Sequence, residues 1–174
     1  MCNSTIYLCH NQIYMQRDKD RDYKRKPYPY PYIGKCFNNN QCFGAFHCNI
    51  RSISANIDNL QHLLSELSSP FSLIGITETK LKANIPPTTN IEIQGYYFVS
   101  EPSLSNAGGV AFYIKNSLDF SIRSNISSTT NDFETLWLEV SNGNHSNLLC
   151  GVVYRHPNGD LEAFNKYFNK LLTK

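Results

Sequence analysis

The chain has 174 residues, of which 41% are hydrophobic and 17% are charged, and its formal net charge is +2. This length suits one domain with a real core, and the near-neutral charge neither requires nor excludes a nucleic-acid partner. No apolar run of about eighteen residues occurs, and the N-terminus has neither the basic nor the apolar region of a signal peptide. We therefore expect an intracellular protein without a transmembrane segment.

The sequence contains six cysteines, and no two of them form a CxxC pair. Without a secretory signal they are most simply reduced thiols. A zinc site would have to use Cys36, Cys42, His47 and Cys48. Their spacing fits no standard ligand pattern, so zinc is not predicted.

Residues 1–42 differ in composition from the rest of the chain. The stretch "RDKDRDYKRKPYPYPYIGK" carries mixed charge and then alternating proline and tyrosine, which favours extended backbone over a packed element. We interpret this region as a flexible, basic, Pro- and Tyr-rich arm. The alternative is that its basic cluster at 24–26 and its tyrosines contact nucleic acid by charge and stacking.

From residue 43 the pattern predicts an incomplete α/β domain that continues to residue 174. "CFGAFHC" is typical of a buried strand, and "FSLIGIT" of a second one. Between them, apolar residues at helical spacing predict a helix with Ser52 or Ser54 as its N-cap: Ile53, Ile57, Leu60, Leu64 and Leu67. Strand, helix and strand at this spacing indicate a βαβ unit with parallel strands.

The remainder predicts mostly antiparallel strands and a last helix. Strands are expected in "GYYFVS", "GGVAFYIK", "FETLWLEV" and "NLLCGVVYR", and "LDFSIR" is expected to be the hairpin partner of "GGVAFYIK". Turns are indicated at Asn142-Gly143 and Asn158-Gly159. Asp160 can cap the helix, whose expected apolar face is Leu161, Phe164, Phe168, Leu171 and Leu172. The fold class is therefore mixed α/β, with largely antiparallel sheets flanked by helices.

Three polar residues follow or end predicted strands: Asn49, Glu78 and Tyr154. Ligands of open α/β sheets collect at the carboxyl ends of strands. Amide and carboxylate oxygens suit Mg²⁺, and a tyrosine hydroxyl suits a phosphate oxygen. Together they suggest a phosphoester hydrolase. The alternatives are that Asn49 caps the following helix, that Glu78 is a solvated loop acid, and that Tyr154 is a core tyrosine.

Five segments in this order resemble the endonuclease domain of LINE-type, non-LTR retrotransposon proteins: "FHCNIRSISANIDNLQHLL", "FSLIGITETKL", "GYYFVSEPSLSNAGGVAFYIKNSL", "FETLWLEV" and "LLCGVVYRHPN". That family is a branch of the endonuclease/exonuclease/phosphatase superfamily with the DNase I-like fold. The resemblance covers residues 43–174 and implies a partial four-layer α/β sandwich. It also implies Mg²⁺-dependent cleavage of DNA and a nuclear location.

The resemblance also implies roles for individual residues. Glu78 matches the principal metal-binding glutamate, and Asn49 matches an asparagine that helps to form the metal and phosphate site. Tyr154 matches a tyrosine that contacts the scissile phosphate. Arg51 and Arg155 are candidate substrate-binding residues, and for Arg155 the role stays open between phosphate contact and structural support.

Two later motifs of the family, which resemble "GDFN" and "SDH", do not occur in this sequence. A displacement at phosphorus requires a positioned nucleophile and stabilised charge together, so we expect little or no nuclease activity from this chain alone. An incomplete sandwich would also leave a sheet face for the missing C-terminal half or another chain to cover. Three hypotheses remain: a truncated endonuclease remnant, a fragment of a longer active enzyme, and a non-catalytic nucleic-acid or protein-binding module.

Overall fold

The structure is a computed structural model that describes residues 43–67, 71–141 and 147–172. The elements, in chain order, are β1 (Ala45–Asn49), α2 (Ile53–Glu66), β2 (Leu73–Thr77), β3 (Tyr96–Glu101), β4 (Val110–Lys115), β5 (Phe120–Ile122), β6 (Ser128–Thr129), β7 (Phe133–Val140), β8 (Leu148–Arg155) and α3 (Leu161–Leu172). The arm predicted at 1–42 and the turn predicted at Asn142-Gly143 lie outside the described residues.

The first sheet has the strand order β1-β2-β4-β3. β1 and β2 are parallel and are connected through α2, which confirms the predicted βαβ unit. The helix buries Ile53, Ile57 and Leu60 against one face of this sheet, where they contact Ile74 and Ile76 of β2. Ser52 occupies the N-cap position, but its hydroxyl makes no capping hydrogen bond.

The second sheet is built around β7. β8 pairs antiparallel along the whole of β7, while β5 and β6 pair with different parts of it. The prediction that residues 118–123 form a hairpin with β4 is wrong, because β5 pairs with β7 instead. β4 already has β2 on one side and β3 on the other, so neither of its edges was free to accept a hairpin partner.

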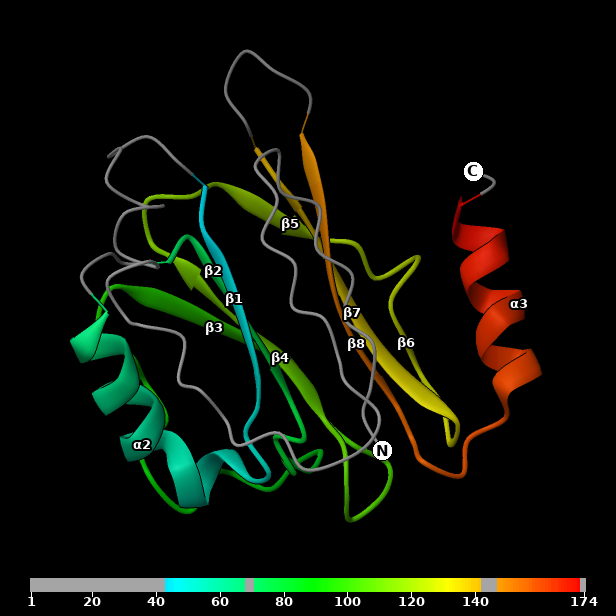
Figure 1. Ribbon diagram of the computed structural model, residues 1–174, viewed down its shortest axis with the longest axis horizontal. Coiled ribbons are helices and arrows are strands. Elements are labelled where there is room, and N and C mark those ends of the chain that lie inside the picture. Colours follow the sequence, from blue (N-terminus) through cyan, green and yellow to red (C-terminus); the bar gives the residue numbers. More distant parts are fainter. Residues whose placement is uncertain (1–42, 68–70, 142–146, 173–174) are drawn as a thin grey trace, which may run out of the picture.

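The two sheets face one another across an apolar core, and the helices cover their outer faces (Figure 1). The core between the sheets takes its side chains from alternate strand positions: Leu73, Val110, Phe112 and Ile114 from the first sheet, and Leu136, Leu138, Val152 and Tyr154 from the second. Alternation with a period of two gives each strand one such face. The order of layers is α2, first sheet, second sheet, α3, as the resemblance implied.

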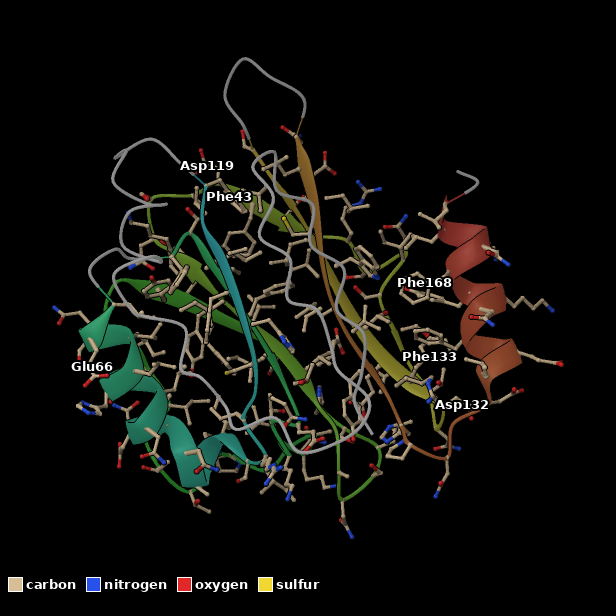
Figure 2. The ribbon with its side chains drawn as sticks, in the orientation of Figure 1. Phe43, Glu66, Asp119, Asp132, Phe133 and Phe168 are labelled. Atoms are coloured by element: carbon tan, nitrogen blue, oxygen red, sulfur yellow. The ribbon has the colours of Figure 1, made fainter. Side chains whose placement is uncertain are left out.

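Helix α3 contacts the outer face of the second sheet through aromatic side chains. Asp160 caps it, since its Oδ1 accepts a hydrogen bond from the amide of Glu162 at 2.8 Å. Phe133 of β7 packs edge-on against Phe164, and Trp137 packs against Phe168 (Figure 2). The predicted apolar face is only partly correct, because the first and last leucines of the helix lie at its exposed ends, at 57% and 77% exposure. Tyr167 packs against the sheet instead: its ring contacts Phe133, and its hydroxyl accepts a hydrogen bond from the Trp137 ring nitrogen at 2.6 Å.

Within the described ranges, neither helix is long and apolar enough to cross a membrane.

Candidate active site

The predicted polar residues Asn49 and Glu78 are in direct contact at one end of the sandwich. The Asn49 side-chain nitrogen donates a hydrogen bond to Oε1 of Glu78 at 2.6 Å, although the two residues are 29 positions apart. Asn49 Oδ1 accepts from the backbone amide of Arg51 at 3.1 Å, which fixes which end of the amide faces Glu78. The contact arises because β1 and β2 are parallel neighbours in register, with Asn49 opposite Thr77.

The backbone around this pair adopts unusual conformations. Arg51, Glu78 and Lys80 all have φ near +57°, at 56°, 57° and 56°. Such values cost about 1–2 kcal/mol for each residue with a Cβ, so surrounding contacts must hold them. Those contacts are backbone hydrogen bonds: the amides of Thr79 and Lys80 donate to the carbonyls of Gly109 and Gly108 at 3.1 and 2.8 Å. The chain around Glu78 is therefore held in a fixed shape.

Tyr154 reaches the same place from the second sheet. Its side chain is 2% exposed. Burial, the negative charge of Glu78, a hydrogen bond with Glu78 and the charge of Glu134 together raise the pKa of Tyr154 to about 12. The phenol is therefore protonated at neutral pH and acts as a hydrogen-bond donor. The structure brings Asn49, Glu78 and Tyr154 together, from three strands that the sequence separates widely.

The chemistry of these donors is compatible with Mg²⁺. Magnesium in proteins is commonly held by one or two carboxylates, with waters and substrate phosphate oxygens completing its coordination. Glu78 supplies a partly exposed carboxylate. Asn49 presents its nitrogen to that carboxylate, so in this arrangement it orients Glu78. Among the described residues, no group of three histidine, cysteine, aspartate or glutamate side chains lies close enough to hold a metal ion.

The two arginines lie in different surroundings. The Arg51 side chain is exposed, in the segment that follows β1. The Arg155 guanidinium donates to the carbonyls of His156 and Gly159 at 3.1 and 3.0 Å. These two hydrogen bonds stabilise the turn between β8 and α3. Of the two roles considered for Arg155, phosphate contact and structural support, they correspond to structural support.

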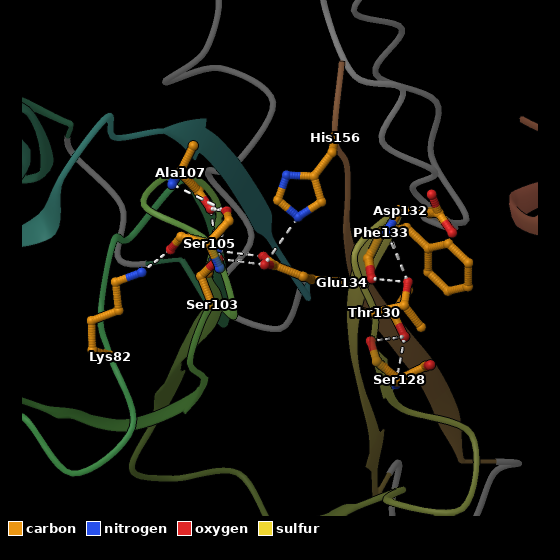
Figure 3. A network of polar contacts seen from close by, with 12 residues as sticks. Lys82, Ser103, Ser105, Ala107, Ser128, Thr130, Asp132, Phe133, Glu134 and His156 are labelled. Atoms are coloured by element: carbon orange, nitrogen blue, oxygen red, sulfur yellow. Dashed lines mark hydrogen bonds and ion pairs between the residues drawn. The ribbon is translucent and has the colours of Figure 1, made fainter. Parts of the chain in front are cut away.

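Sequence reasoning missed Glu134, whose charge acts on Tyr154 and whose polar contacts with Ser103 and His156 are drawn in Figure 3. It has no exposed surface and is the residue directly opposite Tyr154 in the β7–β8 ladder. The available signal was its phase within "FETLWLEV", because Glu134 shares the apolar face of Leu136 and Leu138. A glutamate in the apolar phase of a buried strand requires polar partners.

No family model and no curated protein matches the chain. Solved structures do match. The AP endonuclease LMAP from Leishmania major is 18% identical with a TM-score of 0.50, over 71% of this chain and 42% of that one. The endonuclease domain of TRAS1, a telomere-specific non-LTR retrotransposon, is 11% identical with a TM-score of 0.49, over 72% and 51%. The 3′ phosphatase NExo from Neisseria, bound to a product DNA hairpin, is 14% identical with a TM-score of 0.43, over 73% and 48%.

The chain has a DNase I-like fold, the fold that it shares with the AP endonuclease LMAP. Its layers and its mostly antiparallel sheets agree with that assignment. The chain spans about half the length of the solved structures that it matches.

Proposed function

We propose that residues 43–174 are the N-terminal portion of a Mg²⁺-dependent phosphodiesterase domain that acts on DNA, of the kind found in non-LTR retrotransposon proteins. The observation that carries the proposal is the convergence of Asn49, Glu78 and Tyr154 at one end of the sandwich. Under this proposal the protein works in the nucleus, where its substrate lies.

Each of these residues has a distinct role in the proposed reaction. Glu78 would hold Mg²⁺, which supplies positive charge to stabilise the developing negative charge on the phosphate. Asn49 keeps the Glu78 carboxylate in one orientation through its 2.6 Å hydrogen bond. Tyr154 is protonated because its pKa is raised to about 12, and its hydroxyl, which hydrogen-bonds Glu78 in the free protein, would turn to donate to a phosphate oxygen when the substrate binds. The side chains of Arg51 and Lys80 are exposed and would contact the DNA backbone.

We propose further that the 174-residue chain alone has little nuclease activity. Glu134 and His156, the buried carboxylate and imidazole beside Tyr154, contact one another with 3.3 Å between Oε1 and Nε2, so neither is free to activate an attacking water. Catalytic groups that act as a unit lose most of their effect when one is missing. The groups that position the attacking water and the phosphate would come from the two later family motifs, which resemble "GDFN" and "SDH" and do not occur in this sequence.

The edges of the two sheets suggest where such groups would attach. In the described part of the chain, β1 pairs only with β2, and β8 pairs only with β7, so one edge of each strand is unpaired (Figure 1). Unpaired edges readily accept another strand. We propose that a C-terminal continuation of the polypeptide, or another chain, covers them. The alternative function, a non-catalytic module that binds nucleic acid or protein, uses these same edges.

Two experiments test the proposal. The first is to sequence the transcript beyond the codon for Lys174 and to express any longer product. A longer product should nick supercoiled plasmid only with Mg²⁺, and Glu78→Gln should abolish nicking, whereas Glu66→Gln on the exposed end of α2 should not. The second is to incubate the 174-residue chain itself with the plasmid. Robust nicking that depends on Glu78 would overturn the claim of inactivity, and a longer product that does not nick would favour the binding module.

A further inference from the structure

The carboxylate of Glu134 is completely buried and has three hydrogen-bond partners from three segments. Ser103 donates its hydroxyl to Oε1 at 2.6 Å, the Gly109 amide donates to Oε2, and Nε2 of His156 lies 3.3 Å from Oε1 (Figure 3). Neighbouring positions on this face of β7 are leucines. Because a buried carboxylate is commonly less favourable than a well-packed apolar residue, its place here calls for a role beyond filling the core.

One set of contacts connects Glu134 to Glu78. The carboxylate lies against the Gly108–Gly109 segment so closely that a Cβ added to Gly108 would stand 2.7 Å from both of its oxygens. The carbonyls of the same two glycines accept the hydrogen bonds from Thr79 and Lys80 that hold the backbone just after Glu78. Glu134 therefore supports the left-handed conformation of Glu78 through a single intervening turn.

A second set connects Glu134 to Tyr154. The two residues are directly opposite in the β7–β8 ladder. His156, which contacts Glu134, also packs edge-on against the Tyr154 ring, with 5.1 Å between centroids and an interplanar angle of 86°. Two residues therefore confine the Tyr154 ring: Glu134, opposite it on β7, and His156, which contacts Glu134.

We propose that Glu134 is a positioning residue, which fixes Glu78 of the first sheet and Tyr154 of the second relative to one another from inside the sandwich. The inference rests on the proposed function, because the relative placement of Glu78 and Tyr154 matters only if both act on one phosphodiester. The loop of residues 103–107 completes the arrangement. Lys82 donates to the carbonyl of Ser105, and the Ser103 hydroxyl lies 2.6 Å from the carbonyl oxygen of Ala107 as well as from Glu134, so these two acceptors share its single proton.

The test compares Glu134→Gln with Glu139→Gln in isotope-labelled protein. Glu139 lies on the same strand but is paired on the other side with Arg123 and Asn147. Glutamine keeps the shape of Glu134 but removes its charge, and an NH₂ in place of Oε1 could only donate to Ser103 and His156, not accept from them. The readouts are the NMR resonances of the Glu78 amide and the Tyr154 ring, and the dissociation constant for Mn²⁺ measured by paramagnetic broadening at Glu78. Tyr154→Phe identifies the correct ring among the eleven tyrosines.

We expect Glu134→Gln to shift both resonances and to weaken Mn²⁺ binding by about tenfold, as is usual when a partner behind a metal ligand is lost. Glu139→Gln should change neither. If Glu134→Gln lowers only the urea midpoint and leaves both resonances and the Mn²⁺ constant unchanged, Glu134 is merely structural and the proposal is wrong. If Glu134→Gln does not fold, Ser103→Ala replaces it in the test, because it removes one hydrogen-bond donor to Glu134. The same two resonances and the same Mn²⁺ dissociation constant are then measured.

The failure of the proposed function is distinguishable from the failure of this inference. If Mn²⁺ causes no broadening at Glu78 in the unsubstituted chain, the proposed metal site is wrong. The positioning role is then decided by the resonances alone: shifts at both Glu78 and Tyr154 in Glu134→Gln support it, and their absence overturns it.

Discussion

The side-chain nitrogen of Asn49 lies 2.6 Å from Oε1 of Glu78, so the last residue of β1 orients the carboxylate that follows β2. This contact depends on the parallel pairing of the two strands, which places Asn49 opposite Thr77, one residue before Glu78. It also depends on the neutrality of Asn49, because an amide donates to a carboxylate whereas a second carboxylate would repel it.

We therefore expect Asn49→Asp to lower the free energy of unfolding by about 1–2 kcal/mol without divalent ions, through charge repulsion and loss of the hydrogen bond. Millimolar Mg²⁺ should restore most of this loss, because an ion bound between two carboxylates stabilises the folded state. Urea unfolding with and without Mg²⁺ measures both effects. Asn59→Asp, on the exposed face of α2, should cost less than about 0.5 kcal/mol and show no Mg²⁺ response. Equal Mg²⁺ responses in the two variants would contradict the proposed metal site.

A second prediction concerns Gly109, at the turn that holds the backbone after Glu78. Gly109 has φ of 84°, and a Cβ there would overlap Oγ1 of Thr79. Gly95 has a similar φ of 87° but nothing within 4 Å of its Cβ position. Gly95→Ala should cost about 1 kcal/mol from backbone strain alone, and Gly109→Ala about 1–3 kcal/mol more from overpacking. Urea unfolding of both variants separates the two terms, and equal losses would show that the close approach to Thr79 is unimportant.

The sequence alone was sufficient to predict the two helices and every described strand except β6, and to single out the polar residues at or just after the ends of three strands. The segments "GGVAFYIK" and "FETLWLEV" were informative because each has a face of large apolar residues at every second position, and the core between the sheets uses these predicted faces. The parallel β1–β2 pair was predictable because a helix of 14 residues connects them. Parallel strands in register bring Asn49 and Glu78 to one edge without further information.

The partner of residues 118–123 and the role of Glu134 were not predictable in the same way. Hairpin pairing is a local expectation, and here competition for the edges of β4 decided the outcome. Glu134 belongs to the site through contacts with residues 31 and 22 positions away, Ser103 and His156. The residue pattern of β7 cannot identify these distant partners. The position of Glu134 on the same face as Leu136 and Leu138 indicates only that polar partners exist.

A third prediction assigns Arg155 to the turn rather than to the substrate. Its guanidinium donates to two carbonyls, those of His156 and Gly159. Arg155→Lys keeps the charge but not the planar fork that reaches both acceptors. We expect it to lower the free energy of unfolding by about 1–2 kcal/mol and to leave Mn²⁺ broadening at Glu78 unchanged. Lys166→Gln on α3 is the control for a surface charge. A large loss of affinity for short DNA duplexes, without loss of stability, would instead assign Arg155 to phosphate binding.

The last prediction concerns His47 on β1, whose ring nitrogen Nε2 lies 3.3 Å from the Thr77 hydroxyl. Burial lowers the pKa of His47 from 6.5 to about 4. The unfolded chain therefore binds a proton at this residue between pH 6.5 and about 4, while the folded chain does not. The stabilisation is fully present above pH 6.5 and is lost as the pH falls towards 4.

The full shift corresponds to about 3 kcal/mol, but His47 lies on an edge strand and is only partly buried. Solvent screening should reduce its contribution to about 1–2 kcal/mol. His47→Gln should remove this part of the pH dependence, which urea unfolding between pH 7 and pH 4 measures. His62→Gln, at an exposed position on α2, should leave the pH dependence nearly unchanged. If both variants lose stability on acidification as steeply as the unsubstituted chain, His47 is solvated and β1 is not packed as described.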